Sequence, residues 1–265
     1  MPLRPYRQEL EALHARYDDR RYVHPDPLEA VLRYDDPGDR EVAALLASAL
    51  AYGRVQQILR SVQGALERMQ PGPLCFLREA SSETLRRTFV DFRHRFAAGE
   101  QVASLLYGAK RMLEEHGSLE ACFSAGLRSD HETVLPALSA FVRRLSAAAG
   151  GKCGHLLPDP ARGSACKRMN LFLRWMVRRD NVDPGGWQAV PAAMLIVPLD
   201  THMHKIGLAL GASRRKTADL RTALEITEAF RAIRPDDPAR YDFALTRLAI
   251  RGELPGRLFS AIRRA

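Results

Sequence analysis

Residues 164–206 have the sequence SACKRMNLFLRWMVRRDNVDPGGWQAVPAAMLIVPLDTHMHKI, and this stretch decides how the rest of the chain is interpreted. After Lys167, apolar residues recur at the spacing of an amphipathic helix. Further on, an apolar run and Pro198 lead to Asp200, and Asp is a preferred N-cap residue. The stretch therefore predicts two helices, one with a lysine in its first turn and one that begins at an aspartate.

Helical patterns continue on both sides of this stretch, whereas strand patterns are scarce. We expect Asp39 to cap a helix that starts at Arg40. The sequence predicts an all-α fold. The expected helices cover 3–17, 40–52, 55–69, a segment from Ser81 or Ser82, 99–116, 130–148, 164–179, 187–196, 201–210, 217–234 and a segment from Asp236.

A loop rich in Gly and Pro, residues 150–163, is the best candidate boundary within the chain. We expect a single helical domain over residues 1–265. It should consist of two helical lobes, at about 1–150 and 151–265, with a cleft between them.

The chain is basic: 40 Lys and Arg residues stand against 31 Asp and Glu residues in 265, for a net charge of +9. A basic protein favours an anionic partner, and nucleic acid is the commonest one. A surface kept basic only for solubility is the alternative.

Other features argue against several classes of protein. The N-terminal residues lack the apolar segment of a signal peptide, and no apolar run reaches the roughly 18 residues of a membrane span. None of the four cysteines forms a CxxC pair, which argues against zinc and iron–sulfur sites. We expect a cytoplasmic, nucleoid-associated monomer with reduced thiols, no metal, no cofactor and no membrane partner.

Lys167 follows a tight loop that contains Gly163 and Ser164. A hairpin of this kind leaves backbone N–H groups at a helix N-terminus, where they suit a phosphate. The positive helix end also disfavours the ammonium form of the lysine, which favours a neutral amine nucleophile. Position alone favours the simpler alternative, a surface lysine beside a loop.

Asp200 is explained by capping alone. A carboxylate at a helix end can also face a cleft while it caps. There it can stabilise a developing oxocarbenium ion, as carboxylates do at glycosidic bonds.

Together, these residues resemble the helix-hairpin-helix DNA glycosylases, whose signature is a hairpin lysine followed by P-[VL]-D-x-[HR]. In this chain Pro198–His202 supplies that segment, PLDTH, and its Asp200 lies 33 residues after Lys167. The spacing suits the archaeal 8-oxoguanine glycosylase (AGOG) branch, and the chain resembles an uncharacterised bacterial family related to it. The resemblance implies a helix-hairpin-helix element, Lys167 as the nucleophile and Asp200 as its assistant. The resemblance to these glycosylases is closest over about residues 150–250.

One departure from the pattern concerns the hairpin, which usually has the form G-[VI]-G-x-K. Here Ala165 replaces the second glycine. An alanine fits only if its φ angle is negative. The resemblance also implies that Gly163, Ser164, Arg168 and His202 contact DNA.

Several further residues are weaker candidates. Tyr52 and Arg54 lie where such glycosylases probe the minor groove, although Gly53 also suits an ordinary helix turn. Trp175 and Trp187 are candidates to stack on an extruded base, with core packing the simpler expectation for Trp175. The archaeal branch makes Asp242 a candidate base contact; the alternative is a solvated acid paired with Arg240 or Arg247.

Two further patterns have ordinary explanations. His202 and His204 point about 200° apart on a helix, so they are not expected to chelate one ion. Arg178-Arg179 and Arg214–Lys216 are expected to be solvated charge runs that also suit phosphates.

From these observations we expect a base-excision DNA glycosylase with AP-lyase activity on damaged duplex DNA. 8-Oxoguanine is the expected base, on the resemblance alone. One alternative is a non-catalytic helix-hairpin-helix DNA-binding protein. Another is a basic helical protein that binds RNA or another protein.

Overall fold

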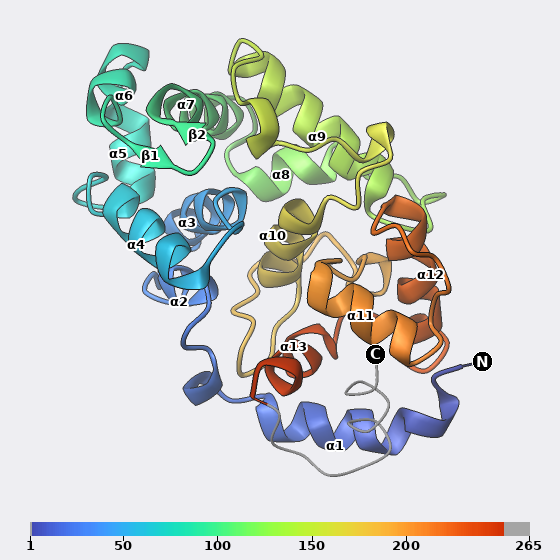
Figure 1. The fold of residues 1–265 in the computed structure, drawn as a ribbon. Coiled ribbons are helices and arrows are strands. Elements are labelled where there is room, and N and C mark those ends of the chain that lie inside the picture. The colour runs from blue at the N-terminus through green and yellow to red at the C-terminus, as the bar shows by residue number, and fades with distance from the viewer. Residues whose placement is uncertain (1, 252–265) are drawn as a thin grey trace. The chain divides into compact units, whose positions relative to one another are not determined.

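The computed structural model describes residues 2–251, and these residues are mostly helical, as the sequence predicts (Figure 1). No helix in this part of the chain is long and apolar enough to cross a membrane. The helices and strands are α1 (Arg7–Tyr17), α2 (Leu28–Val31), α3 (Pro37–Ala49), α4 (Val55–Leu66), α5 (Pro73–Glu79), α6 (Ser82–Thr88), β1 (Arg93–His94), β2 (Ala97–Ala98), α7 (Gly99–His116), α8 (Leu119–Ser124), α9 (Leu135–Ala148), α10 (Lys167–Val177), α11 (Thr201–Ala209), α12 (Leu220–Arg231) and α13 (Asp242–Arg251).

The chain forms two compact units. Unit 1 comprises residues 1–22, 132–134 and 160–265, and unit 2 comprises residues 23–131 and 135–159. The predicted lobes differ from these units at the N-terminus, because the first 22 residues belong with the C-terminal part. The physical reason is that α1 packs on α13, where the Tyr241 hydroxyl donates to Glu11 Oε1 at 2.6 Å.

Unit 2 is built around α3, in which residues 41–49 are all buried. Asp36, rather than Asp39, caps this helix: its side chain accepts from the Asp39 N–H at 2.9 Å. The prediction for Asp39 was wrong because its carboxylate binds elsewhere, accepting from the Leu74 N–H at the start of α5. An aspartate beside a helix start can therefore serve a neighbouring helix instead.

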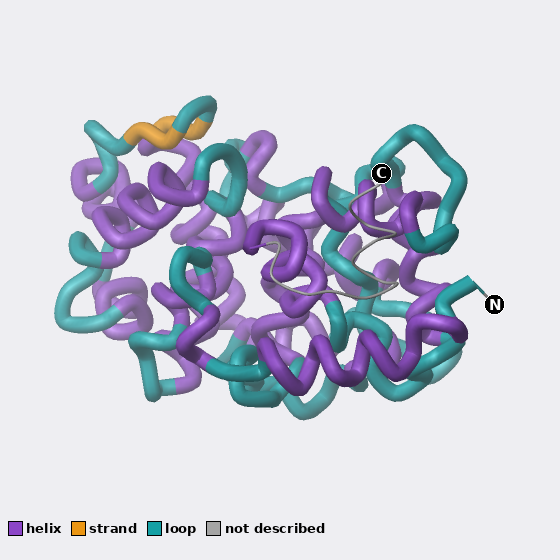
Figure 2. The backbone as a smooth tube through the Cα atoms, turned by 60° about the horizontal axis from the view of Figure 1, so that its bottom comes forward, coloured by secondary structure: helices purple, strands orange, loops and turns teal. Residues whose placement is uncertain are grey.

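A two-stranded antiparallel hairpin is the only sheet among residues 2–251, and Figure 2 shows it as a short paired segment at the surface of a helical chain. β1 pairs with β2 so that Arg93 lies opposite Ala98 and His94 opposite Ala97. Arg95 and Phe96 form the connecting turn. The hairpin leads directly into α7.

Unit 1 departs from the expected helices in two places. Residues 187–196 form no α-helix but a loop with a 3₁₀ turn at Ala192–Met194, in which only Trp187, Val190, Leu195 and Ile196 are buried. Pro191 and Pro198 break the helical pattern there. The last helix starts at Asp242 rather than at Asp236, because the Asp237 side chain binds Arg178 instead of capping a helix.

The contact between α7 and α9 predicts how unit 2 responds to one added methyl group. A Cβ on Gly108 in α7 would lie 2.7 Å from the Leu145 carbonyl oxygen and 3.3 Å from Ala149 Cβ. We expect Gly108→Ala to lower the free energy of unfolding by about 1–3 kcal/mol, measured by urea denaturation. Gly64→Ala, on the open side of α4, is the control and should raise it by about 0.5–1 kcal/mol. Equal stability of both variants would contradict close α7–α9 packing.

Candidate functional site

The loop before α10 is a tight turn with two left-handed residues. Gly163 has a φ of 78° and Cys166 a φ of 47°, whereas Ala165 is not among the residues with positive φ. The alanine that replaces the usual hairpin glycine is therefore accommodated without strain, because the left-handed position falls on the next residue. The Gly163 carbonyl accepts from the Leu220 N–H at 3.1 Å, which ties the loop to α12.

Local hydrogen bonds fix the same loop from inside. The Ser164 hydroxyl accepts from the Cys166 N–H at 3.2 Å, and the Asn170 side-chain amide donates to the Ala165 carbonyl at 3.0 Å. Before the loop, the chain forms only a 3₁₀ turn at Pro160–Arg162. The structure thus has a short 3₁₀ turn where the expected helix-hairpin-helix element would have its first α-helix.

Lys167 is the first residue of α10 and is half-buried, as is Arg168. The Cys166 side chain does not cap the helix. Gly163 and Ser164, the other predicted DNA contacts of this loop, are exposed. The loop thus presents its backbone at the surface and places Lys167 at the positive end of α10.

Asp200 caps α11, as the sequence predicts. Its Oδ1 atom accepts from the N–H groups of His202 at 2.9 Å and Met203 at 2.8 Å. Its Oδ2 atom accepts no hydrogen bond from any residue in 2–251. The half-buried carboxylate therefore caps with one oxygen and leaves the other available.

A buried ion network lies beside these two residues. Arg174 Nη1 donates to Asp242 Oδ2 at 2.5 Å, and its Nε and Nη2 atoms donate to Asp183 Oδ1 at 3.2 and 3.1 Å. Arg174 is 3% exposed and Asp242 6% exposed. Burial raises the pKa of Asp242 to about 6; Arg174 opposes this rise and the charge of Asp200 adds to it.

Arg178 is the second cation of the network. Its guanidinium binds Asp183, Asp180 at 2.8 Å and Asp237 at 2.9 Å. Burial raises the pKa of Asp183, and the two arginines oppose that rise. The prediction of a solvated Arg178-Arg179 run was therefore wrong for Arg178, which is 4% exposed, and correct for the exposed Arg179.

The ion pairs of this network connect α10 to α13, and α11 packs on α13. Lys167 and Arg174 are seven residues apart, which places them on the same face of α10, about 10 Å apart along its axis. Arg174 binds Asp242 at the start of α13, and Asp242 senses the charge of Asp200 at the start of α11. The starts of α10, α11 and α13 thus each carry an ionisable side chain, and all three helices lie in unit 1.

The three predicted base-recognition residues are buried in unit 1. Trp175 is fully buried, and Trp187 is 4% exposed with its ring 5.2 Å from that of Phe172. Core packing therefore explains both tryptophans. The alternative expectation for Asp242, a solvated acid paired with Arg240 or Arg247, was wrong, because Asp242 is buried and binds Arg174.

Tyr52 and Arg54, the predicted minor-groove probes, lie in unit 2. The Tyr52 hydroxyl donates to the His94 carbonyl at 2.9 Å and lies 3.0 Å from His155 Nε2. Tyr52 therefore holds the base of the β-hairpin rather than projecting from the surface. Arg54 precedes α4 and is exposed.

The histidines of α11 do not face each other. His202 is exposed, whereas His204 is half-buried with its Nε2 atom 2.8 Å from the Arg215 carbonyl oxygen. Arg214 and Lys216 are exposed, and Arg215 binds Asp219 at 2.7 Å. All four cysteines are free, and only Cys75 is exposed.

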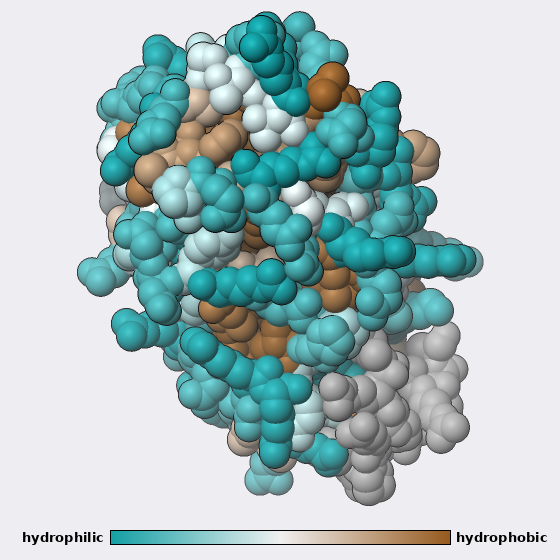
Figure 3. Space-filling view, turned by 90° about the vertical axis from the view of Figure 1, so that its left-hand side faces the viewer, coloured by the Kyte–Doolittle hydropathy of each residue, from teal (hydrophilic) through white to brown (hydrophobic). Residues whose placement is uncertain are grey.

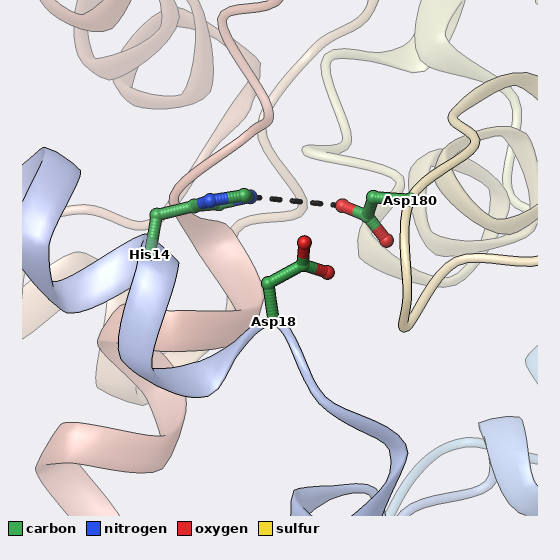
Figure 4. A group of neighbouring side chains, drawn as sticks. All are labelled: His14, Asp18 and Asp180. Carbon is green, nitrogen blue, oxygen red and sulfur yellow. Dashed lines mark ion pairs between the residues drawn. The ribbon is translucent and has the colours of Figure 1, made fainter.

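One group in unit 1 has the donor atoms of a metal site: His14, Asp18 and Asp180 (Figure 4). The carboxylate of Asp18 already accepts from the backbone and side-chain N–H groups of Asn181. Asp180 accepts from Arg178 and from two backbone N–H groups, and its Oδ2 lies 3.7 Å from His14 Nε2. A cation there would compete with Arg178, so the group is better explained as a joint between α1 and the loop after α10.

Sequence reasoning missed Arg174, Arg178 and Asp183 as the residues that hold the site together. The available signal was the spacing of Arg174 and Arg178, which places two cations one turn apart in the otherwise apolar run 171–178. Charges in such a position require buried partners.

Comparisons with known proteins give one family. Residues 26–251 match the DUF2400 family model, described as "Protein of unknown function (DUF2400)". No curated protein and no solved structure matches the chain significantly.

The buried carboxyl of Asp242 predicts a pH-dependent stability. The folded protein retains this proton up to a pH of about 6, whereas the unfolded chain loses it at an ordinary pKa of 3.8. The contribution of this group to stability is therefore present below about pH 4 and lost as pH rises through about 6. Relative to Asp242→Asn, the wild type should lose about 2 kcal/mol of unfolding free energy between pH 4 and pH 7, measured in urea. Parallel curves for the two proteins would contradict the raised pKa.

Proposed function

This chain belongs to the DUF2400 family, and we propose that it is a base-excision DNA glycosylase with AP-lyase activity. The observation that carries the proposal is the start of α10. A tight loop with two left-handed residues presents Lys167 at the helix N-terminus, in the same unit as the capping carboxylate of Asp200. Together these residues provide an amine and a carboxylate on rigid elements, as a Schiff-base route requires.

In the proposed reaction, the neutral amine of Lys167 attacks C1′ of a nucleotide extruded from the duplex. The bond between C1′ and the base breaks, and the base leaves with the bonding electrons and takes up a proton. Opening of the sugar ring then gives a Schiff base between Nζ and C1′. Loss of a C2′ proton expels the 3′ phosphate and nicks the strand, and hydrolysis of the imine frees the lysine.

Asp200 supports the first step electrostatically. Positive charge develops on the sugar as the glycosidic bond breaks, and a nearby carboxylate stabilises it. Because the cap uses Oδ1, the helix fixes the carboxylate while Oδ2 stays available. Arg174 and Asp242 would act as positioning residues that hold α10 and α13 beside α11.

DNA is the proposed partner, and the net charge of +9 supports it. The backbone of the exposed Gly163–Ser164 turn and the exposed His202 are proposed phosphate contacts. An oxidised purine, 8-oxoguanine in particular, is the proposed substrate on the basis of the PLDTH resemblance. The Schiff-base route needs no metal ion or redox group. We propose that the protein acts as a monomer in the cytoplasm.

The lysine is tested by a strand-nicking assay on end-labelled duplexes that carry 8-oxoguanine or an abasic site. We expect Lys167→Ala to abolish nicking of both duplexes, because no other residue forms the imine. Lys205→Ala, which changes an exposed lysine on α11, is the control and should nick like the wild type. Nicking by Lys167→Ala at the wild-type rate would remove Lys167 from the mechanism.

A wild-type protein that binds damaged duplex but nicks neither substrate would favour the non-catalytic DNA-binding alternative. Preferential binding to RNA or to protein, with no preference for damaged duplex, would favour a basic helical protein that binds RNA or another protein.

The aspartate has a matched control within the same unit. Asp200 (φ −112°, ψ −172°) caps α11 and Asp219 (φ −110°, ψ −176°) caps α12 with nearly the same backbone. Asparagine still accepts the capping hydrogen bonds, so each variant keeps its helix and loses one charge. Asp200→Asn should slow single-turnover base release by about 10²-fold or more, whereas Asp219→Asn should leave it near the wild-type rate. Equal rates for the two variants would contradict an electrostatic role of Asp200.

A further inference from the structure

The turn of the β-hairpin in unit 2 exposes a large aromatic side chain. Phe96 is 77% exposed, and Val90, in the loop before the hairpin, is 75% exposed. By contrast, Phe89 and Phe92 in the same segment are buried beneath the hairpin with their rings 6.1 Å apart. Phe96 therefore lacks the hydrophobic stabilisation that Phe89 and Phe92 gain from burial.

The same turn holds a strained residue. Arg95 has a φ of 52°, one of two non-glycine residues with positive φ among the described residues; the other is Cys166, next to Lys167. A bulky side chain at positive φ costs free energy, and such strain concentrates at functional sites. The Arg95 guanidinium carbon lies 5.5 Å from the centre of the Phe96 ring.

Gly53 accommodates this arrangement. A Cβ on Gly53 would lie 2.7 Å from both Cδ and Nη1 of Arg95, so the arginine side chain covers the glycine backbone. The φ of Gly53 is 99°, which also favours glycine. The turn between α3 and α4 thus supports the hairpin tip from below.

The base of the hairpin is firmly anchored. His94 is fully buried, with Nδ1 2.9 Å from the Ser61 hydroxyl and Nε2 3.1 Å from the Tyr52 carbonyl oxygen. The Tyr52 hydroxyl in turn donates a hydrogen bond to the His94 carbonyl oxygen. Burial lowers the pKa of His94, so the anchor is an uncharged imidazole near neutral pH. Phe96 is therefore carried by a rigid support.

The surroundings of the tip are cationic. Arg54, Arg93 and Arg95 are exposed and form no ion pair with any residue in 2–251. The two nearest acids in the sequence are already paired, Asp91 with Arg68 at 2.6 Å and Glu100 with Lys152 at 3.0 Å. Figure 3 looks onto this side of unit 2 and shows apolar side chains exposed among strongly hydrophilic ones.

We propose that Phe96 is a wedge that inserts between stacked base pairs of duplex DNA, with Arg95, Arg93 and Arg54 on the flanking phosphates. Apolar wedges of this kind unstack a base step, and guanidinium groups hold the backbone on either side. A rigid hairpin suits this role because insertion must overcome base stacking. The inference takes DNA as the partner from the proposed function, but it does not depend on Lys167 chemistry.

The test uses the full chain and a duplex with 2-aminopurine beside a central mismatch, since 2-aminopurine brightens when it unstacks. We expect the wild type to raise the fluorescence. Phe96→Ala should lose most of that rise and bind the duplex about tenfold more weakly by fluorescence anisotropy. Phe96→Trp should retain both signals, and Val90→Ala, which removes an exposed apolar side chain nearby, should behave like the wild type.

The outcomes separate this inference from the proposed function. Wild-type unstacking and affinity in Phe96→Ala would overturn the wedge, even if the protein nicks damaged strands. A Phe96-dependent signal in a protein that nicks nothing would support the wedge and overturn the lyase. Absence of duplex binding by the wild type at low salt would overturn both.

Discussion

The buried ion network of Arg174 and Arg178 is the constraint on which the rest of unit 1 depends. Two guanidinium groups on an apolar helix are taken out of water, and they are stable there only with carboxylates at hydrogen-bond distance. Those carboxylates come from the loop after α10, the turn before α13 and α13 itself. Removal of any one partner leaves a buried charge uncompensated, so the network fixes α10 relative to α13 and, through Asp180 and His14, relative to α1. Lys167 lies at the start of α10 and Asp200 caps α11, which packs on α13, and a nucleophile and a carboxylate need precise placement.

Local signals predicted a large part of the fold. The bounds of α7, the cap of α6 at Ser81 and the cap of α11 at Asp200 agree with expectation, because capping and periodicity act within a few residues. The failures involve distant partners. Residues 187–196 form a loop that buries only Trp187, Val190, Leu195 and Ile196, and Asp237 binds Arg178 from 59 residues away instead of starting a helix. Similarly, the positions of Lys167 and Asp200 at helix starts were predictable, whereas the burial of Asp242 and the exposure of Phe96 were not, since no periodic pattern encodes either.

Backbone strain connects the two proposed DNA-contacting elements. Cys166 and Arg95 both adopt left-handed φ without being glycine, and both are held by surrounding hydrogen bonds or packing. One directly precedes the proposed nucleophile, and the other directly precedes the proposed wedge. Strain of this kind persists only where the surrounding structure maintains it. Its occurrence at these two turns is consistent with two elements that are preorganised for one nucleic-acid partner, one for chemistry and one for distortion of the duplex.

The proposed function depends on a covalent imine between Lys167 and DNA. The most direct test is to reduce the protein with borohydride in the presence of an abasic duplex and to map the peptide that carries the adduct. We expect one reduced cross-link, on the peptide that contains Lys167, with a mass increase equal to the attached deoxyribose fragment. A cross-link on a different lysine, or no cross-link from a protein that nicks the same duplex, would contradict it.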